Sequence, residues 1–260
     1  MNTMHHFSAR GIAAVSTLVC LTIAMSWAWA APRKTAGGGS LSFTAADAKT
    51  LKGTDNDSIA DVLAKLTKLN QAKGKDALNP AVEPLIESAW NELRLPEDQR
   101  WNLMDIIKVL SMTGDARAKP LFLHIVSAIK GAGNPYTAQG FLLMGSAAAK
   151  DLADSLQSKS PGTRGRAALT LFKISQYDKT GAFFSPQIRE TIKTCLVANL
   201  KDPNVNVRIY SVSALASFGD SSVIPALEQI EKKDAHKDSG GVYEVRVEAT
   251  DALKKLRAKK

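Results

Sequence analysis

The feature that most constrains this chain is a short pattern that occurs twice near its C-terminus. The first copy is Val207-Arg208, Ser211 and Ala214-Leu215, and the second is Val245-Arg246, Ala249 and Ala252-Leu253. Each residue of the second copy lies 38 residues after its counterpart. A fixed period in this range is typical of proteins built from stacked helical pairs. Such solenoids usually act by presenting a surface, because each repeat packs only against its neighbours.

The clearest repeat unit predicts two helices joined by a tight break. Asp202 and Pro203 predict the start of the first helix, because a carboxylate can cap it and proline suits the first helical position. Gly219 and Asp220 predict the break, because glycine tolerates the left-handed conformation and aspartate can cap the next helix. Pro225 falls within the first turn of that second helix, where it is tolerated.

Earlier parts of the chain repeat this skeleton. One copy is Leu110, Gly114, Asp115, Pro120 and Leu121, and a partial copy is Arg164, Ala167 and Thr170-Leu171. The alternative, a helical bundle without repeats, does not explain these shared spacings. We therefore expect an all-α fold of about five helical pairs, followed by a final helix over roughly residues 242–256.

The repeat resembles the HEAT-repeat family, in the short variety also found in phycobilisome lyases. The family carries an aspartate six residues before an arginine at the head of the first helix, and Asp202 and Arg208 match this spacing. The resemblance implies a right-handed α-α superhelix with Asp202, Arg208 and Arg246 in structural roles. It is closest over residues 202–256 and weaker toward residue 58. The departures are Gly240, six residues before Arg246, and Ser158, six residues before Arg164.

The first 30 residues have the pattern of a secretory signal peptide. Arg10 is the only full charge before Arg33, and an uncharged, mostly apolar run separates the two. The tripeptide Ala28-Trp29-Ala30 offers small residues for cleavage after Ala30. The alternative is an uncleaved inner-membrane anchor, because about 20 apolar residues can span a bilayer. We expect cleavage, and a periplasmic or secreted bacterial protein.

The mature chain is expected to begin with a flexible tether over residues 31–53, followed by one repeat domain over residues 54–260. The tether contains Gly37-Gly38-Gly39-Ser40 and few large apolar residues, so it cannot bury enough surface to fold. Cys195 is the only cysteine after residue 30, and we expect it to be a small buried hydrophobe.

The net charge of +9 favours acidic partners. Much of it lies near the C-terminus, where Lys254, Lys255 and Arg257 are the candidate docking residues for an anionic envelope polymer. The other interpretation is a solvated cap on the last repeat. A nucleic-acid partner is not expected, because no continuous basic stripe with interleaved aromatic residues occurs.

The chain shows no pattern of residues typical of catalysis, a metal site or a cofactor site. His236 lies between Asp234 and Asp238, but this lysine-rich loop is a poor metal cage. His124 lies in an apolar helix, where a packed side chain is the simpler interpretation. We therefore expect a protein that is not an enzyme and needs no cofactor.

Four aromatic residues in predicted inter-helix loops are candidate partner contacts: Tyr136, Phe183, Phe184 and Tyr243. Loops on one rim of a solenoid often bind ligands. Phe183-Phe184 also precedes Ser185-Pro186, so the pair could instead staple a helix start. Trp90 and Trp101 flank a short turn and are expected to pack together or against it.

The function that these features favour is a monomeric, exported scaffold that binds a protein whose identity the sequence does not reveal. A bilin-lyase-like enzyme is the alternative by fold analogy, and export argues against it.

Overall fold

The computed structural model describes residues 41–129, 135–178, 181 and 183–258, and these belong to one compact unit, Leu41–Lys260. The predicted signal peptide, residues 1–30, lies outside the described residues. Every regular element over the described ranges is helical, which confirms the all-α prediction. None of these helices is both long enough and apolar enough to cross a membrane.

Over the described residues, the repeat domain contains five helical pairs and a final helix, as predicted. The pairs are α3 (Asn56–Lys73) with α4 (Val82–Arg94), α5 (Leu103–Thr113) with α6 (Lys119–Ala128), α7 (Pro135–Met144) with α8 (Ser146–Ser155), α9 (Pro161–Tyr177) with α10 (Pro186–Asn199), and α11 (Val205–Phe218) with α12 (Ile224–Lys233). The final helix is α13 (Glu244–Arg257), and α2 (Ala45–Leu51) precedes the first pair. Short 3-10 turns lie at Lys75–Ala81, Glu97–Gln99, Ala116–Ala118 and Ser221–Val223.

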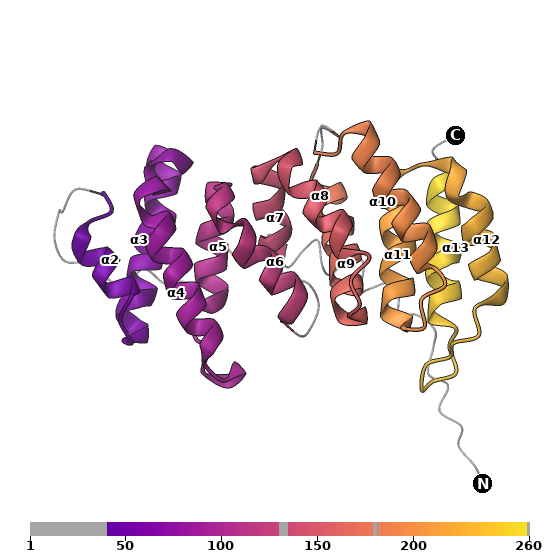
Figure 1. Ribbon diagram of the computed structural model, residues 1–260, viewed down its shortest axis with the longest axis horizontal. Helices are drawn as coiled ribbons and strands as arrows, with labels where there is room; N and C mark the ends of the chain where they lie inside the picture. The colour runs from indigo at the N-terminus through magenta and orange to yellow at the C-terminus, as the bar shows by residue number, and fades with distance from the viewer. Residues whose placement is uncertain (1–40, 130–134, 179–180, 182, 259–260) are drawn as a thin grey trace, which may run out of the picture. The chain divides into compact units, whose positions relative to one another are not determined.

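The helices stack in two layers along one row (Figure 1). The first helices of the pairs contact one another in the order α3, α5, α7, α9, α11 and α13. The second helices α4, α6, α8 and α10 form the other layer in the same way. The apolar core is therefore a stripe between neighbouring repeats, which is the arrangement of a solenoid.

The predicted glycine–aspartate break appears in two repeats. Gly114 ends α5 with a φ of 62°, and Gly219 ends α11 with a φ of 71°. Asp115 and Asp220 then accept hydrogen bonds from backbone N–H groups two residues later. Each aspartate caps a 3-10 turn, and the α-helix follows that turn. Pro225 lies in the first turn of α12, as predicted.

Small residues allow neighbouring repeats to approach closely. Ala167, Ser211 and Ala249 occupy matching repeat positions in α9, α11 and α13, and all three are fully buried. At Gly140 in α7, an added Cβ would lie 2.0 Å from the ring of Phe122. The small side chains at the repeat positions therefore reflect helix packing.

The prediction of a tether over residues 31–53 is wrong for residues 41–53. Thr44 and Asp47 form a capping box that starts α2. Leu51 is fully buried, and α2 packs on α3 and α4. An ion pair of 2.7 Å joins Asp47 to Lys65 in α3. The folded domain therefore starts near Leu41, because this short segment has its own cap and its own apolar anchor.

Arginines at the heads of the first helices link consecutive repeats. Arg164 Nε donates to Asp202 Oδ2 at 2.6 Å, and Arg208 Nε donates to Asp234 Oδ2 at 2.7 Å. Arg208 also donates to the carbonyl oxygen of Asp202 at 2.8 Å. Arg246 Nε donates to the carbonyl oxygen of Asp234 at 2.6 Å. The pattern that suggested the family is therefore a ladder of ion pairs and carbonyl contacts.

This ladder corrects two predictions. Asn204, and not Asp202, caps α11, because its side chain accepts from the N–H groups of the first turn. Gly240 lies six residues before Arg246, where the family has an aspartate. In the structure, Asp234 makes the contacts of that aspartate instead. Like Asp202, it pairs with an arginine of the preceding first helix and accepts from the N–H two residues later. A longer connection separates Asp234 from Arg246, so the spacing of six residues is lost.

Candidate functional site

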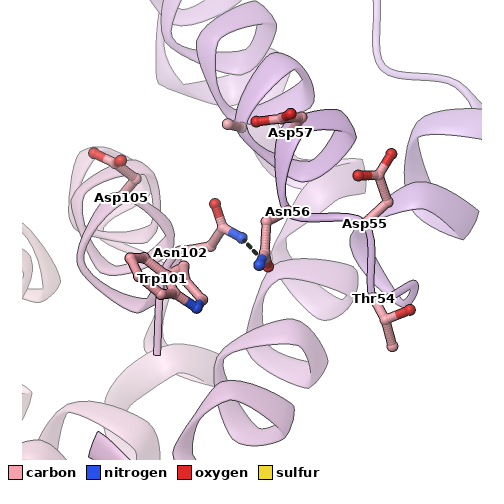
Figure 2. A pocket seen from close by; sticks show the side chains of 8 residues that line it. Thr54, Asp55, Asn56, Asp57, Trp101, Asn102 and Asp105 are labelled. Atoms are coloured by element: carbon pink, nitrogen blue, oxygen red, sulfur yellow. Dashed lines mark hydrogen bonds between the residues drawn. The ribbon is translucent and has the colours of Figure 1, made fainter. Parts of the chain in front are cut away.

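A pocket of about 620 Å³ opens to solvent between the start of α3 and the start of α5 (Figure 2). We call it the Trp101 pocket, and its lining residues are Thr54, Asp55, Asn56, Asp57, Ala60, Trp101, Asn102 and Asp105. The sequence analysis did not identify it. Its walls come from two consecutive repeats, so the stacking of α3 against α5 creates it.

The acidic residues of the Trp101 pocket sit at two helix starts. Asp55 is the N-cap residue of α3, and Asp57 lies in the first turn of that helix. Asp105 lies in the first turn of α5. Carboxylates at these positions stabilise helices, because the N-terminus of a helix carries about half a positive charge. Helix formation therefore explains why acidic residues are tolerated here.

Trp101 is the most exposed large hydrophobic residue in the described part of the chain, at 71 %. It lies on the connection between α4 and α5. Trp101 was expected to pack with Trp90 or against the turn between them, but its side chain is exposed, and Trp90 packs against His124 in α6 at 4.8 Å between ring centroids. A tryptophan normally buries much of its ring, so this exposed ring makes the adjoining pocket the candidate site.

Asn102 forms the floor of the Trp101 pocket and is only 4 % exposed. Its amide nitrogen donates to Asn56 Oδ1 at 3.0 Å, and its backbone N–H donates to Glu92 Oε2 at 3.2 Å. Its amide oxygen accepts no hydrogen bond from any residue that the structure describes. That oxygen points into the space between Asp57 and Asp105 (Figure 2).

The carboxylates of the Trp101 pocket leave a local negative charge. Asp55, Asp57 and Asp105 make no ion pair with any described residue, although Ser58 donates a hydrogen bond to Asp55. Two helix N-termini together offset about one of these three charges. The pocket is therefore acidic within a chain of net charge +9, and its acceptors suit a cationic hydrogen-bond donor.

Phe183 and Phe184 are not available to a partner, which corrects their assignment as candidate contacts. They are 3 % and 4 % exposed, and the centroids of their rings lie 4.7 Å apart. Phe184 also packs on Phe218 of α11, and the guanidinium of Arg189 lies over both rings. The pair therefore packs the connection before α10 against α11.

The two tyrosines are partly buried and have cationic neighbours. Tyr136 lies in the first turn of α7, and not in a loop as predicted, with Lys108 Nζ 6.0 Å from its ring centroid. Tyr243 is the N-cap residue of α13. Lys237 Nζ lies 4.7 Å and Arg246 Cζ lies 3.9 Å from the centroid of its ring. Both rings therefore have roles in packing.

The basic C-terminal residues are exposed but partly neutralised. Lys254 contacts Asp251 at 3.4 Å, and Arg257 contacts Glu228 at 2.6 Å. Lys255 makes no ion pair within the described ranges. These contacts agree with a solvated cap, although they leave Lys255 accessible.

Three further residues singled out in the sequence have structural surroundings. Cys195 is half-buried rather than buried, and burial raises the pKa of its thiol, which keeps it protonated. His124 packs on Trp90, beside a second pocket of about 370 Å³ along α4. His236 Nε2 lies 3.9 Å from a carboxylate oxygen of Glu244. Over the described residues, no group of three or more histidines, cysteines and carboxylates could hold a metal ion.

Comparison with known proteins agrees with the helical-pair architecture. Residues 207–231 match the family model described as PBS lyase HEAT-like repeat. These residues cover most of α11 and α12. No curated protein sequence matches the chain significantly.

Two solved structures are similar in part to this chain. One is an engineered protein with 17 % identity and a TM-score of 0.43, covering 82 % of this chain and 96 % of its own. The other is a designed armadillo repeat protein in complex with the peptide (KR)4, with 14 % identity and a TM-score of 0.44. That match covers 81 % of this chain and 98 % of the designed protein. The chain therefore contains one matched HEAT-like repeat unit, over residues 207–231, within a row of stacked helical pairs.

Proposed function

We propose that this chain is an exported, monomeric scaffold that binds another protein through the surface of its HEAT-like repeats. The observation that carries the proposal is Trp101, a large apolar side chain left 71 % exposed beside an open pocket. A stack of helical pairs holds such a surface rigidly, which lowers the entropy cost of binding.

Affinity capture from a bacterial envelope fraction tests the binding role. The bait is the chain from Ala31 to Lys260, and the control bait carries Trp101→Ala. We expect one or more proteins to bind the first bait saturably and the control bait more weakly. The proposal fails if no protein binds saturably and the chain instead turns over a small molecule.

Export is the second part of the proposal, and its support is the pattern of residues 1–30. Expression of the full chain in a bacterium should give a periplasmic or secreted product whose first residue is Ala31. Replacing both Ala28 and Ala30 by lysine should leave the longer, uncleaved chain in the membrane fraction. A full-length product in the cytoplasm would contradict export.

An anionic envelope polymer is a second candidate partner, favoured by the exposure of Lys232, Lys233 and Lys255. It predicts salt-sensitive retention on heparin that falls when Lys254, Lys255 and Arg257 become glutamine. Retention that ignores both salt and these substitutions rejects this candidate.

A further inference from the structure

We propose that one edge of the last three repeats docks this protein on the surface of an anionic lipid bilayer. The inference goes beyond the proposed function, because neither the protein partner nor the polymer candidate requires a membrane surface. Three observations lead to it: a row of unpaired lysines, the buried pairing of the aspartates beside them, and an exposed valine at the same edge.

The lysines lie on three consecutive connections, each of which leads from a second helix into the next first helix. We call them the lysine edge, and its members are Lys159 between α8 and α9, Lys201 between α10 and α11, and Lys232, Lys233 and Lys237 at the end of α12 and before α13. All five side chains are exposed. None makes an ion pair with any residue that the structure describes.

These three connections lie next to one another in space. Arg164 at the head of α9 contacts Asp202 before α11, and Arg208 at the head of α11 contacts Asp234 after α12. Neighbouring helices pack about 10 Å apart, so the lysine edge spans about 20 Å. The connection from α12 to α13 extends past the ends of the helices beside it (Figure 1). The lysines can therefore reach one flat surface together.

The aspartates of the same connections do not neutralise the lysines. Asp202 and Asp234 are 8 % and 9 % exposed, and each is already paired with an arginine of the ladder. Two further carboxylates lie in the last connection and at the start of α13, namely Asp238 and Glu244. Because the five lysines outnumber them, the edge carries an excess of positive charge.

The other end of the row of first helices is acidic. Asp55, Asp57 and Asp105 lie at the starts of α3 and α5. An anionic surface therefore attracts the last three repeats and repels the first two. Docking through the lysine edge would leave the Trp101 pocket open to a protein partner.

Val242 distinguishes a bilayer from a soluble polyanion. It lies in the same connection as Lys237 and is 37 % exposed. A lipid interface can bury such a side chain between basic neighbours, whereas a polyanion in water offers it no apolar contact.

The shape of the edge favours the same ligand. Neither of the two pockets described above lies on the lysine edge. A flexible polymer would lose conformational freedom by aligning along an edge without a groove. A bilayer already presents many anionic headgroups on one surface, so several weak contacts add together.

Co-sedimentation of the chain from Ala31 to Lys260 with lipid vesicles tests the inference. The vesicles contain either phosphatidylcholine alone or equal parts of phosphatidylcholine and phosphatidylglycerol. We expect binding only to the vesicles that contain phosphatidylglycerol. High salt should release the protein, because it screens exposed charges.

A matched pair of triple variants separates the lysine edge from the overall charge. The first replaces one lysine of each connection: Lys159→Gln, Lys201→Gln and Lys233→Gln. It should weaken vesicle binding at least tenfold, because each lysine near an anionic surface contributes about fivefold. The control makes the same change in net charge at exposed lysines in and just after α3: Lys68→Gln, Lys73→Gln and Lys75→Gln. It should leave binding nearly unchanged, and both variants should unfold at the wild-type temperature.

Val242→Ser tests the lipid contact itself. It should weaken binding to the phosphatidylglycerol vesicles about twofold to fivefold, because a partly exposed valine no longer enters the interface. Retention of the same variant on heparin, a soluble polyanion, should equal that of the wild type.

Three results would overturn the inference. The first two are equal binding to the two kinds of vesicle and equal weakening by the two triple variants. The third is wild-type vesicle binding by Val242→Ser together with loss of both vesicle and heparin binding in the lysine-edge variant, which would assign the edge to soluble polyanions. Capture of an envelope protein that depends on Trp101 would leave the scaffold proposal intact in each case.

Discussion

Single residues in this protein connect one repeat to the next. Asp202 accepts from Arg164 through one carboxylate oxygen and from the backbone N–H of Asn204 through the other. Burial alone would raise the pKa of Asp202, but the hydrogen bonds from Arg164 and Asn204 outweigh it and lower that pKa. The residue therefore shapes the turn before α11 and holds it against α9.

Removal of the Asp202 charge should lower the stability of the fold. The side chains of Asp202 and Arg164 are 5 % and 16 % exposed, so Asp202→Asn leaves a nearly buried guanidinium without its counter-ion. We expect the free energy of unfolding, measured by urea denaturation, to fall by about 3 kcal/mol. Asp251→Asn breaks an exposed pair and should cost much less. Equal losses in the free energy of unfolding from both variants would show that the Asp202–Arg164 pair stabilises the fold no more than an exposed ion pair does.

The Asp220 carboxyl should make the free energy of unfolding depend on pH. Hydrogen bonds from Lys193 and Ser222 lower its pKa to about 2, below the unfolded value of about 3.9. A carboxyl whose pKa is lower in the folded state stabilises the fold above the unfolded pKa. That contribution is lost as the pH falls from about 4 to about 2.

Unfolding measured at pH 5 and at pH 2 checks this assignment. Asp220→Asn should be less stable than the wild type at pH 5, and the difference should shrink at pH 2. A difference that stays constant between the two pH values would contradict the role of the Asp220 charge.

At the scale of helices, two glycines show how closely neighbouring elements approach. Gly140 in α7 leaves no room for a methyl group, because a Cβ would lie 2.0 Å from the buried ring of Phe122. At Gly165 in α9, a Cβ would lie 3.6 Å from Val207, which is ordinary contact. The same substitution should therefore have opposite effects in the two helices.

Thermal or urea unfolding of the two alanine variants tests this contrast. Gly140→Ala should lower the free energy of unfolding by about 1–3 kcal/mol, because the clash outweighs the gain in helix propensity. Gly165→Ala should raise it by about 0.5–1 kcal/mol, because alanine favours the helix. A stabilised Gly140→Ala would mean that α6 and α7 lie further apart.

Sequence patterns predicted the elements better than the site. The break at Gly219-Asp220 could be predicted because glycine and aspartate act locally on the backbone. The role of Asp234 could not, since its long connection to Arg246 hides the family spacing. The exposure of Trp101 was not predicted, because the exposure of an aromatic ring depends on which helix faces it. An exposed tryptophan between two acidic helix starts is the signal that could have found the pocket.

At the scale of the whole molecule, coupling should pass only between neighbouring repeats. Among the described first helices, contacts run between neighbours in the row, such as α3 with α5 and α11 with α13. Stability in such a row is a sum of local terms, so a defect in one repeat should stay local.

Hydrogen exchange on two core variants tests this locality. Leu253→Ala in α13 removes a side chain that is 1 % exposed, and should speed exchange in α11 to α13. Leu66→Ala in α3 should speed exchange in α3 to α5 instead. Faster exchange along the whole row in either variant would show a single cooperative unit.

The proposed function places a partner at the Trp101 pocket, and photo-crosslinking in living bacteria tests this most directly. A photoreactive amino acid would replace Thr54, which is exposed and lines the pocket, or Val247, which is 42 % exposed on α13. We predict an envelope protein adduct from position 54 and none from position 247. No adduct at position 54, or the same adducts from both positions, would contradict the account.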